Sequence, residues 1–269
     1  MPSISLEFFA QIAPFWYFGL AALYGAALGS FGNVVTWRLP RSILQEQTTA
    51  QSGLWSRSAC SHCHTQLSLW ENIPIVSYLI LRGRCKHCGV QYGARYFIAE
   101  LCWTGVALAC AFAFQSQPLN GIAVFVGLYL TGLAVQIDLE HQLLPWALSG
   151  ALAVSGFALM PLGSLYWNWQ DALMAGIGVF AFFEALRWLV FKLKGIEGLG
   201  GGDGPFAGAL FVWIGNWQFI GQFLIAACLV FILLSIVTRS RQCPFGPGLA
   251  AGALYCFLSI QGWVPILKF

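Results

Sequence analysis

Long uncharged apolar stretches recur along this chain, and they constrain its fold more than any other feature. Most are roughly 17 to 25 residues long, which is about the length that a helix needs to cross about 30 Å of hydrocarbon. Segments such as Phe219 to Val237 are apolar on every side, whereas a strand of a membrane barrel would alternate apolar and polar residues. The sequence therefore predicts an all-α polytopic membrane protein.

Composition agrees with a chain whose solvent is the bilayer. Of the 269 residues, 58% are hydrophobic and 9% are charged, values that a water-soluble domain rarely shows. The first apolar run has no basic region before it and no convincing cleavage site after it, so we expect it to be retained. We expect eight transmembrane helices, at about 14–37, 96–115, 120–139, 144–163, 171–191, 205–218, 219–238 and 247–266.

The basic residues predict how the chain is oriented. With the N-terminus outside, the loop after the first span and the later connections on that side hold almost all of them, and only Lys268 of the 13 lies outside. Because cytoplasmic loops carry an excess of Lys and Arg, we expect these loops to face the cytoplasm. The residues concerned are Arg38, Arg41, Arg57, Arg82, Arg84, Lys86, Arg95, Arg187, Lys192, Lys194, Arg239 and Arg241.

One long hydrophilic segment, about residues 39–92, separates the first two spans. Its first part, Gln45 to Ser58, is polar and lacks apolar periodicity, so we expect a flexible arm there. Two knuckles of the form Cys-x-x-Cys follow, Cys60-Ser-His-Cys63 and Cys85-Lys-His-Cys88. This pattern is typical of four-thiolate zinc ribbons. We therefore expect structural zinc bound by Cys60, Cys63, Cys85 and Cys88, which would staple a module too small for a large core.

Other readings of the cysteines remain open at this point. A pair of disulfides would need an oxidising compartment, which the expected orientation does not provide, and a redox role or no metal at all are further alternatives. Histidines beside the knuckles could replace a thiolate: His62, His64 and His87. The remaining cysteines lack ligand spacing, so we expect them to be packing or surface residues: Cys102, Cys110, Cys228, Cys243 and Cys256.

Two carboxylates stand out among only ten Asp and Glu residues, because a carboxylate close to hydrocarbon is costly. Asp138 ends the third span, and Asp203 follows the glycine-rich run 198–202 at the start of the sixth. Both fall on the same side of the membrane. Two carboxylates brought together share one proton, so that one can activate water while the other protonates the reacting amide. We expect Asp138 and Asp203 to be a catalytic pair.

Each of these acids also has a simpler interpretation. Asp203 could be an ordinary helix cap, with Gly204 as the other candidate for that position, and Asp138 could be a charge at a helix end. A dinucleotide-binding glycine loop would require a preceding β-strand, which is missing here. Glu140 is expected to be a solvated helix-end charge. Glu100 and Glu184 are expected to make polar contacts between helices.

Four blocks of sequence, in order, resemble the type IV prepilin peptidase family over nearly the whole chain. They are Gly29-Ser30-Phe31-Gly32-Asn33-Val34-Val35-Thr36-Trp37-Arg38-Leu39-Pro40; the two knuckles with Glu71-Asn72-Ile73-Pro74 and Leu81-Arg82-Gly83-Arg84 between them; Ile137-Asp138 through Leu144-Pro145; and Gly200-Gly201-Gly202-Asp203. The chain departs from the family pattern in two places. Trp146 stands where an acid is common, and Gly204-Pro205-Phe206 stands where a lysine-containing stretch is common.

The resemblance implies a function. Members of this family cleave a short basic leader from prepilins and secretion pseudopilins at the cytoplasmic face of the bacterial inner membrane, and many then methylate the new N-terminus with S-adenosylmethionine. It implies that Asp138 and Asp203 are the catalytic aspartates and that the four knuckle cysteines are the family's metal-type motif. If methyl transfer is present, we expect it to depend on the cytoplasmic module, including Gly83. Membrane lipid is an expected partner and nucleic acid is not.

Three domains are expected on this basis: a first transmembrane segment at 1–38, a cytoplasmic zinc module at 39–95 and a transmembrane peptidase domain at 96–269. The runner-up is a non-enzymatic zinc-binding membrane transport or assembly protein, which would favour carboxylates near the middle of the membrane and an internal repeat. A membrane thiol oxidoreductase is a third alternative, in which the Cys-x-x-Cys cysteines would cycle between thiol and disulfide.

Overall fold

The computed structural model describes residues 14–44, 56–159, 168–195, 199–238 and 243–265, and within them the chain is helical apart from loops and two isolated β-bridges. The chain forms two compact units, Met1–Phe125 and Val126–Phe269. Each is described here by itself. The all-α class expected from the sequence is confirmed.

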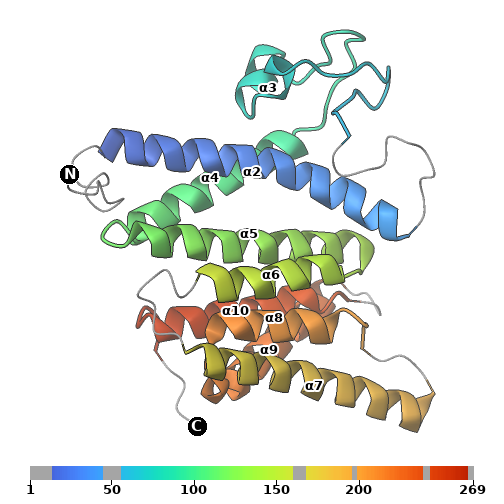
Figure 1. Cartoon of the computed structure of the whole chain (residues 1–269). Coiled ribbons are helices and arrows are strands. Elements are labelled where there is room, and N and C mark those ends of the chain that lie inside the picture. Colours follow the sequence, from blue (N-terminus) through green and yellow to red (C-terminus); the bar gives the residue numbers. More distant parts are fainter. Residues whose placement is uncertain (1–13, 45–55, 160–167, 196–198, 239–242, 266–269) are drawn as a thin grey trace. The chain divides into compact units, whose positions relative to one another are not determined.

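Eight helices of 12 residues or more occupy the places of the eight expected spans (Figure 1). They are α2 (Pro14–Ile43), α4 (Arg95–Ala113), α5 (Pro118–His141), α6 (Trp146–Leu159), α7 (Trp169–Lys194), α8 (Asp203–Ile214), α9 (Ile220–Thr238) and α10 (Gly246–Ile260). Between them lie three short elements: η1 (Trp70–Asn72), α3 (Val76–Ile80) and η3 (Trp217–Phe219).

Five stretches in the described residues are long and apolar enough to cross a membrane: α2, α4, α5, α7 and the stretch Trp217–Thr238 that joins η3 to α9. The helices α6, α8 and α10 have 14, 12 and 15 residues. A 12-residue helix is only about 18 Å long. A multi-pass membrane protein is therefore supported, whereas the count of eight spans stays a prediction.

Some sequence-based expectations fall outside the described residues. Most of the expected flexible arm, Gln45 to Ser58, lies there, as do Gly198 in the glycine-rich run and three of the basic residues used for orientation, Arg239, Arg241 and Lys268. The ends of two expected spans, at residues 163 and 266, lie there as well.

In the first unit, α2 and α4 pack as an antiparallel pair. The Tyr17 hydroxyl donates to the carbonyl of Ala111 at 3.3 Å, and Asn33 Nδ2 donates to the carbonyl of Tyr96 at 3.3 Å. The start of one helix thus lies beside the end of the other. A Cβ atom built on Gly25 would lie 2.7 Å from a backbone oxygen of α4. Small residues permit such close approach between membrane helices.

The second unit is organised around α8. This helix contacts α6, α7 and α10, and Figure 1 shows it between α6 and α7. Phe206 and Phe211 in α8 are fully buried, and Trp213 Nε1 donates to the carbonyl of Leu152 in α6 at 2.7 Å. Because α8 is surrounded, its first residue, Asp203, is also enclosed by neighbouring chain.

Candidate active site and metal centre

Asp138 lies in the last turn of α5 and is buried, with 5% of its surface exposed. Its Oδ2 atom accepts a hydrogen bond of 2.8 Å from the backbone N–H of Gly246, the first residue of α10. A Cβ atom on Gly246 would lie 2.6 Å from the same oxygen. Burial and a specific donor distinguish Asp138 from a solvated charge at a helix end.

Asp203 is the first residue of α8 and is 7% exposed. Its Oδ2 atom accepts from the backbone N–H of Gly200 at 2.9 Å, and its own N–H donates to the carbonyl of Gly200 at 3.1 Å. The helix cap is Gly202, so the expectation that Asp203 or Gly204 occupies that position is wrong. Asp203 does not cap the helix because its carboxylate turns back to accept from the glycine loop. Its two hydrogen bonds with Gly200 hold the loop and the carboxylate in place.

Leu144 packs against two glycines, one next to each acid. A Cβ atom on Gly202, which precedes Asp203, would collide with the Leu144 carbonyl oxygen and would lie 2.6 Å from the Leu144 Cβ. A Cβ atom on Gly246, the donor to Asp138, would lie 3.2 Å from Leu144 Cδ2. The glycines next to the two acids thus pack against the same residue. The structure therefore brings together the two aspartates selected from the sequence.

Both acids lie where helix N-termini can compensate their burial. Asp138 accepts from the first residue of α10, and Asp203 begins α8. The N-terminus of a helix carries a partial positive charge and unpaired N–H groups, which favour a carboxylate. Backbone N–H groups and helix N-termini therefore offset part of the cost of burying these carboxylates.

Glu184 and Arg187 of α7 lie beside the glycine loop. Arg187 Nη2 and Nε donate to Glu184 Oε2 at 2.8 Å and 3.1 Å. Glu184 Oε1 would lie 2.9 Å from a Cβ atom on Gly204, and Arg187 Nη1 would lie 4.0 Å from one on Gly201. The hydrogen bonds of Glu184 are made within α7, at the edge of the site, so the expected contact between helices stays a prediction.

Sequence reasoning missed three contributors to this site: Gly246, Leu144 and Arg187. The Gly246-Pro247-Gly248 run was a usable signal, because proline and glycine mark a helix start with close backbone approach. By contrast, Glu140 is exposed, as expected.

The four knuckle cysteines gather in the first unit. Their sulfurs all lie within 4.8 Å of one another, and the Cys60 and Cys88 sulfurs are 3.8 Å apart. Sulfurs around a tetrahedral zinc with 2.3 Å bonds are about 3.8 Å apart, whereas a disulfide needs about 2.05 Å. All nine cysteines are free. The donor set fits a zinc ion, and among the described residues it is the only cluster of that kind.

The two knuckles use the same local construction. After each first cysteine, a turn is closed by a backbone hydrogen bond of 2.9 Å, from His64 N to the Cys60 carbonyl and from Gly89 N to the Cys85 carbonyl. Both donors have positive φ, at 56° and 72°. In the second knuckle, backbone N–H groups, led by that of Cys88, lower the pKa of Cys85 to about 6, whereas burial and the neighbouring thiols raise the pKa of Cys88 to about 12. Cys85 is therefore the more easily ionised thiol of this knuckle.

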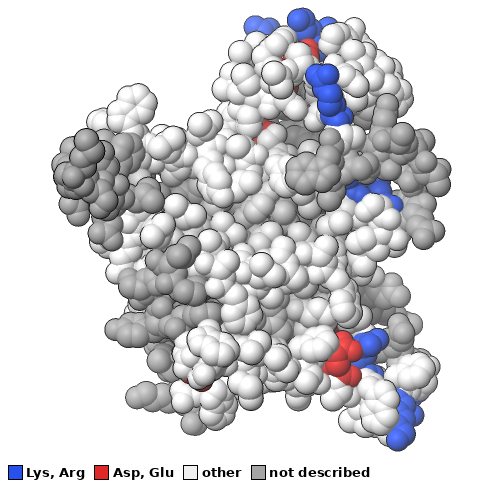
Figure 2. Space-filling view, in the orientation of Figure 1, with Lys and Arg blue, Asp and Glu red and all other residues white. Residues whose placement is uncertain are grey.

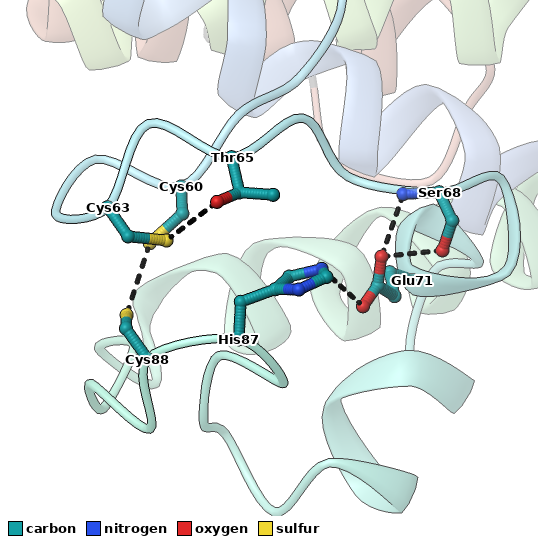
Figure 3. A network of polar contacts seen from close by, with 7 residues as sticks. All are labelled: Cys60, Cys63, Thr65, Ser68, Glu71, His87 and Cys88. Atoms are coloured by element: carbon teal, nitrogen blue, oxygen red, sulfur yellow. Dashed lines mark hydrogen bonds and ion pairs between the residues drawn. The ribbon is translucent and has the colours of Figure 1, made fainter.

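Glu71 joins the two parts of the cysteine module (Figure 3). It accepts from the backbone N–H and the hydroxyl of Ser68 at 2.7 Å and 2.5 Å, and these bonds lower the pKa of its carboxyl. Its other oxygen lies 3.5 Å from His87 Nε2. In Figure 3 the His87 ring points toward Glu71, while Cys60, Cys63 and Cys88 gather at the other end of the network. His87 thus acts as a partner of Glu71 and is not part of the cluster of four thiols.

Gly83 is required by the backbone around it. Its φ is +65°, and a Cβ atom would lie 2.9 Å from the ring of Tyr78. It donates to the Tyr78 carbonyl at 2.9 Å and accepts from Tyr92 N at 2.6 Å. These contacts explain a glycine at this position, and its role in methyl transfer stays a prediction.

Comparison with known proteins places this arrangement in a family. Residues 23–114 match the family described as the bacterial peptidase A24 N-terminal domain, and residues 123–236 match the type IV leader peptidase family. The first match contains the four knuckle cysteines, and the second contains both buried aspartates. The chain belongs to the type IV leader peptidase family. The resemblance found in the sequence is confirmed.

Relatives of this family are similar over almost their whole length. A prepilin leader peptidase/N-methyltransferase of Burkholderia pseudomallei (strain K96243) is 35% identical, over 92% of this chain and 87% of the relative. One from Aeromonas hydrophila is 32% identical, over 94% and 91%. A type 4 prepilin-like proteins leader peptide-processing enzyme of Escherichia coli O78:H11 is 34% identical, over 87% and 91%. No solved structure matches the chain.

Proposed function

We propose that this protein is a membrane aspartic endopeptidase that removes the leader from type IV prepilins or secretion pseudopilins, with Asp138 and Asp203 as its catalytic residues. The observation that carries the proposal is the pair itself. Two buried carboxylates from separate segments each accept a hydrogen bond from a backbone N–H, and the glycines next to them pack against the same residue, Leu144. Membership of the leader peptidase family supplies the substrate class.

The chemistry follows from two acids that share one proton. The ionised carboxylate removes a proton from water, and the resulting hydroxide attacks the carbonyl carbon of the scissile amide. The protonated partner then donates its proton to the amide nitrogen as the C–N bond breaks. The products are a free leader carboxylate and a new N-terminal amine. The hydrogen bonds from Gly246 and Gly200 leave the second oxygen of each acid, Oδ1, available for this exchange.

The membrane arrangement belongs to the same proposal. We infer eight membrane-embedded helices, an inner-membrane location, and a cytoplasmic orientation for the cysteine module and both aspartates, with domains at 1–38, 39–95 and 96–269. The distribution of Lys and Arg supports this orientation. A cysteine introduced at Gln51, which lies outside the described residues, should resist a membrane-impermeant thiol reagent in intact cells whose outer membrane has been permeabilised. Rapid labelling there would contradict the orientation.

We further propose that Cys60, Cys63, Cys85 and Cys88 hold a structural zinc ion. The sulfur spacing supports it, as does a module that packs few buried apolar side chains of its own. Methylation of the new N-terminus would draw on S-adenosylmethionine, which supplies an electrophilic methyl group when bound. The relatives' names support this activity, and Gly83 is our candidate residue for it.

Intact mass tests the proposed function. Purified protein in lipid should convert a prepilin into a species lighter by its leader, and with S-adenosylmethionine the product should gain one methyl mass. A prepilin whose mass never changes would contradict the peptidase proposal. Cleaved product that never gains a methyl, with the cofactor saturating, would leave a peptidase alone.

A further inference from the structure

The segment that contains α3 exposes large apolar side chains on one side. Leu79 and Ile80 are 60% and 66% exposed. On the other side, the ring of Tyr78 stacks on Phe97 of α4 with centroids 4.7 Å apart. Residues three and four apart lie on the same side of a helix. The exposed residues of the helix therefore form one surface, here called the α3 face: Val76, Leu79 and Ile80.

A buried carboxylate fastens α3 to α4. Ile75, just before α3, has φ 64° and ψ −53°, and Val76 N donates to the Pro74 carbonyl at 2.6 Å, which makes a tight γ-turn. Such a turn is strained, particularly for a β-branched residue, and it persists only where the surroundings hold it. Here Ile75 N donates to Glu100 Oε2 at 2.7 Å, and Glu100 is 8% exposed.

These contacts fix the position of α3 relative to the hydrocarbon of the bilayer. The helix α4 has 19 residues, so it is about 28 Å long, against about 30 Å of hydrocarbon to cross. The whole length of α4 is therefore needed to cross the hydrocarbon, and its first turn lies at the boundary. The α3 segment is fastened to Phe97 and Glu100, in the first two turns of α4, and Figure 1 shows it beside the start of that helix. The α3 face therefore lies level with the boundary of the hydrocarbon.

Charge around α3 matches an anionic surface. Arg82, Arg84 and Lys86 follow α3 and are exposed, and Figure 2 shows blue side chains over this part of the molecule. Between residues 56 and 95 the sequence has one carboxylate, Glu71, which is buried. Basic side chains beside an apolar face are the pattern of helices that lie in a membrane interface.

We propose that the α3 face is a membrane anchor. Its apolar side chains enter the acyl-chain boundary of the leaflet at the start of α4, and Arg82, Arg84 and Lys86 reach anionic lipid headgroups. Glu100 sets the depth by holding the turn at Ile75. The anchor keeps the cysteine module against the bilayer surface. This inference rests on α4 crossing the membrane and is independent of the proposed peptidase activity.

Depth-dependent fluorescence quenching tests the anchor in the full-length protein. An environment-sensitive fluorescent amino acid replaces Ile80 in one variant and the exposed His62 of the first knuckle in a control variant, each in phosphatidylglycerol-containing nanodiscs. Lipids brominated on the acyl chain should quench the probe at position 80 strongly and the probe at 62 weakly. Glu100→Leu should reduce quenching at 80 while zinc content stays unchanged. The triple variant Arg82→Gln, Arg84→Gln, Lys86→Gln should remove the dependence of quenching on phosphatidylglycerol.

Two results would overturn the proposal. Equal, weak quenching at positions 80 and 62 would mean that the α3 face is covered by protein or open to water. Weak quenching at 80 together with a change in the probe's emission when a saturating prepilin is added would make the α3 face a docking surface for the substrate rather than for the bilayer.

Discussion

The cysteine module and the aspartate pair place reactive groups in opposite ways. The four cysteines come from two short knuckles that build themselves, because each closes its own turn with hydrogen bonds inside a few residues. The two aspartates come from distant segments, and the donor to Asp138 lies 108 residues away in sequence. The module depends on local turns and a metal, whereas the pair depends on the packing of whole helices.

The two sites also differ in how they tolerate a change of shape. Around the aspartates, glycines permit contacts that no side chain would allow, at Gly202 against Leu144 and at Gly246 against Asp138. In the module, Gly89 has open space around it and is needed only for its positive φ. We therefore expect damage at one site to leave the other intact.

The largest effect should come from removing either ionisable group of the pair. Asp138→Asn and Asp203→Asn keep size and hydrogen-bonding capacity but cannot exchange a proton with water. Each should slow prepilin cleavage by about 10²- to 10⁴-fold, measured by intact mass, with zinc content unchanged. Glu140→Gln is the control, because Glu140 is an exposed neighbour on the same helix. Inactivity of Glu140→Gln alone would show that the wrong acid had been chosen.

Removing the cysteines of one knuckle should abolish zinc binding and leave prepilin cleavage intact. The double change Cys60→Ser and Cys63→Ser removes two of four thiolates, so zinc should fall from one ion per chain to none, as measured by elemental analysis of purified protein. Prepilin cleavage should persist because the carboxylates lie in the other unit. Cys102→Ser, Cys228→Ser is the matched control outside the cluster. Zinc that stays bound after the knuckle change would refute the assignment of the ligands.

A smaller effect should follow from a single methyl group at the donor to Asp138. Gly246→Ala places a Cβ atom 2.6 Å from Asp138 Oδ2, so the acid or the start of α10 must move. Cleavage should fall by about 10- to 100-fold. Gly221→Ala, in α9 with no atom near its Cβ position, should leave the rate unchanged. Equal rates for the two variants would mean that Gly246 does not position the acid.

The smallest effect should be at the link between Glu71 and His87. Glu71→Gln keeps the contact with Ser68 possible but removes the charge that faces His87. Zinc release to a chelator should become faster by about tenfold at most, while cleavage stays the same. His62→Asn changes an exposed knuckle histidine and should not alter zinc release. If both variants behave like the wild type, Glu71 has no part in retaining the metal.

The helices were largely predictable because their lengths follow from apolar runs. The expected spans at about 96–115, 120–139 and 219–238 match α4, α5 and α9 to within two residues at each end. The first was expected to end at residue 37, yet α2 continues through Pro40 to Ile43. The sixth was expected to reach residue 218, but α8 ends at Ile214 because Gly215 adopts a left-handed conformation. Glycine explains the second difference, whereas in the first the helix continues past a proline.

The cysteine cluster was easier to predict from the sequence than the surroundings of the aspartates, because its residues are close together in the chain. Spacing within the chain identifies ligands such as Cys60 and Cys63, since both lie on one turn. Asp138 and Asp203 were selected by their cost near hydrocarbon and by resemblance. No local pattern shows that Gly246 donates to Asp138, because that contact exists only once α5 and α10 are packed. Long-range backbone contacts are what a single sequence does not reveal.

The most direct test of the account compares single-turnover cleavage rates of the wild type, Asp138→Asn, Asp203→Asn and the double variant, with one prepilin in one lipid composition. If the two carboxylates act as one unit, each single change should cost about 10²-fold or more, and the double variant should be little slower than either single variant. Single variants that cleave at near the wild-type rate, or losses that multiply in the double variant, would contradict a shared catalytic pair.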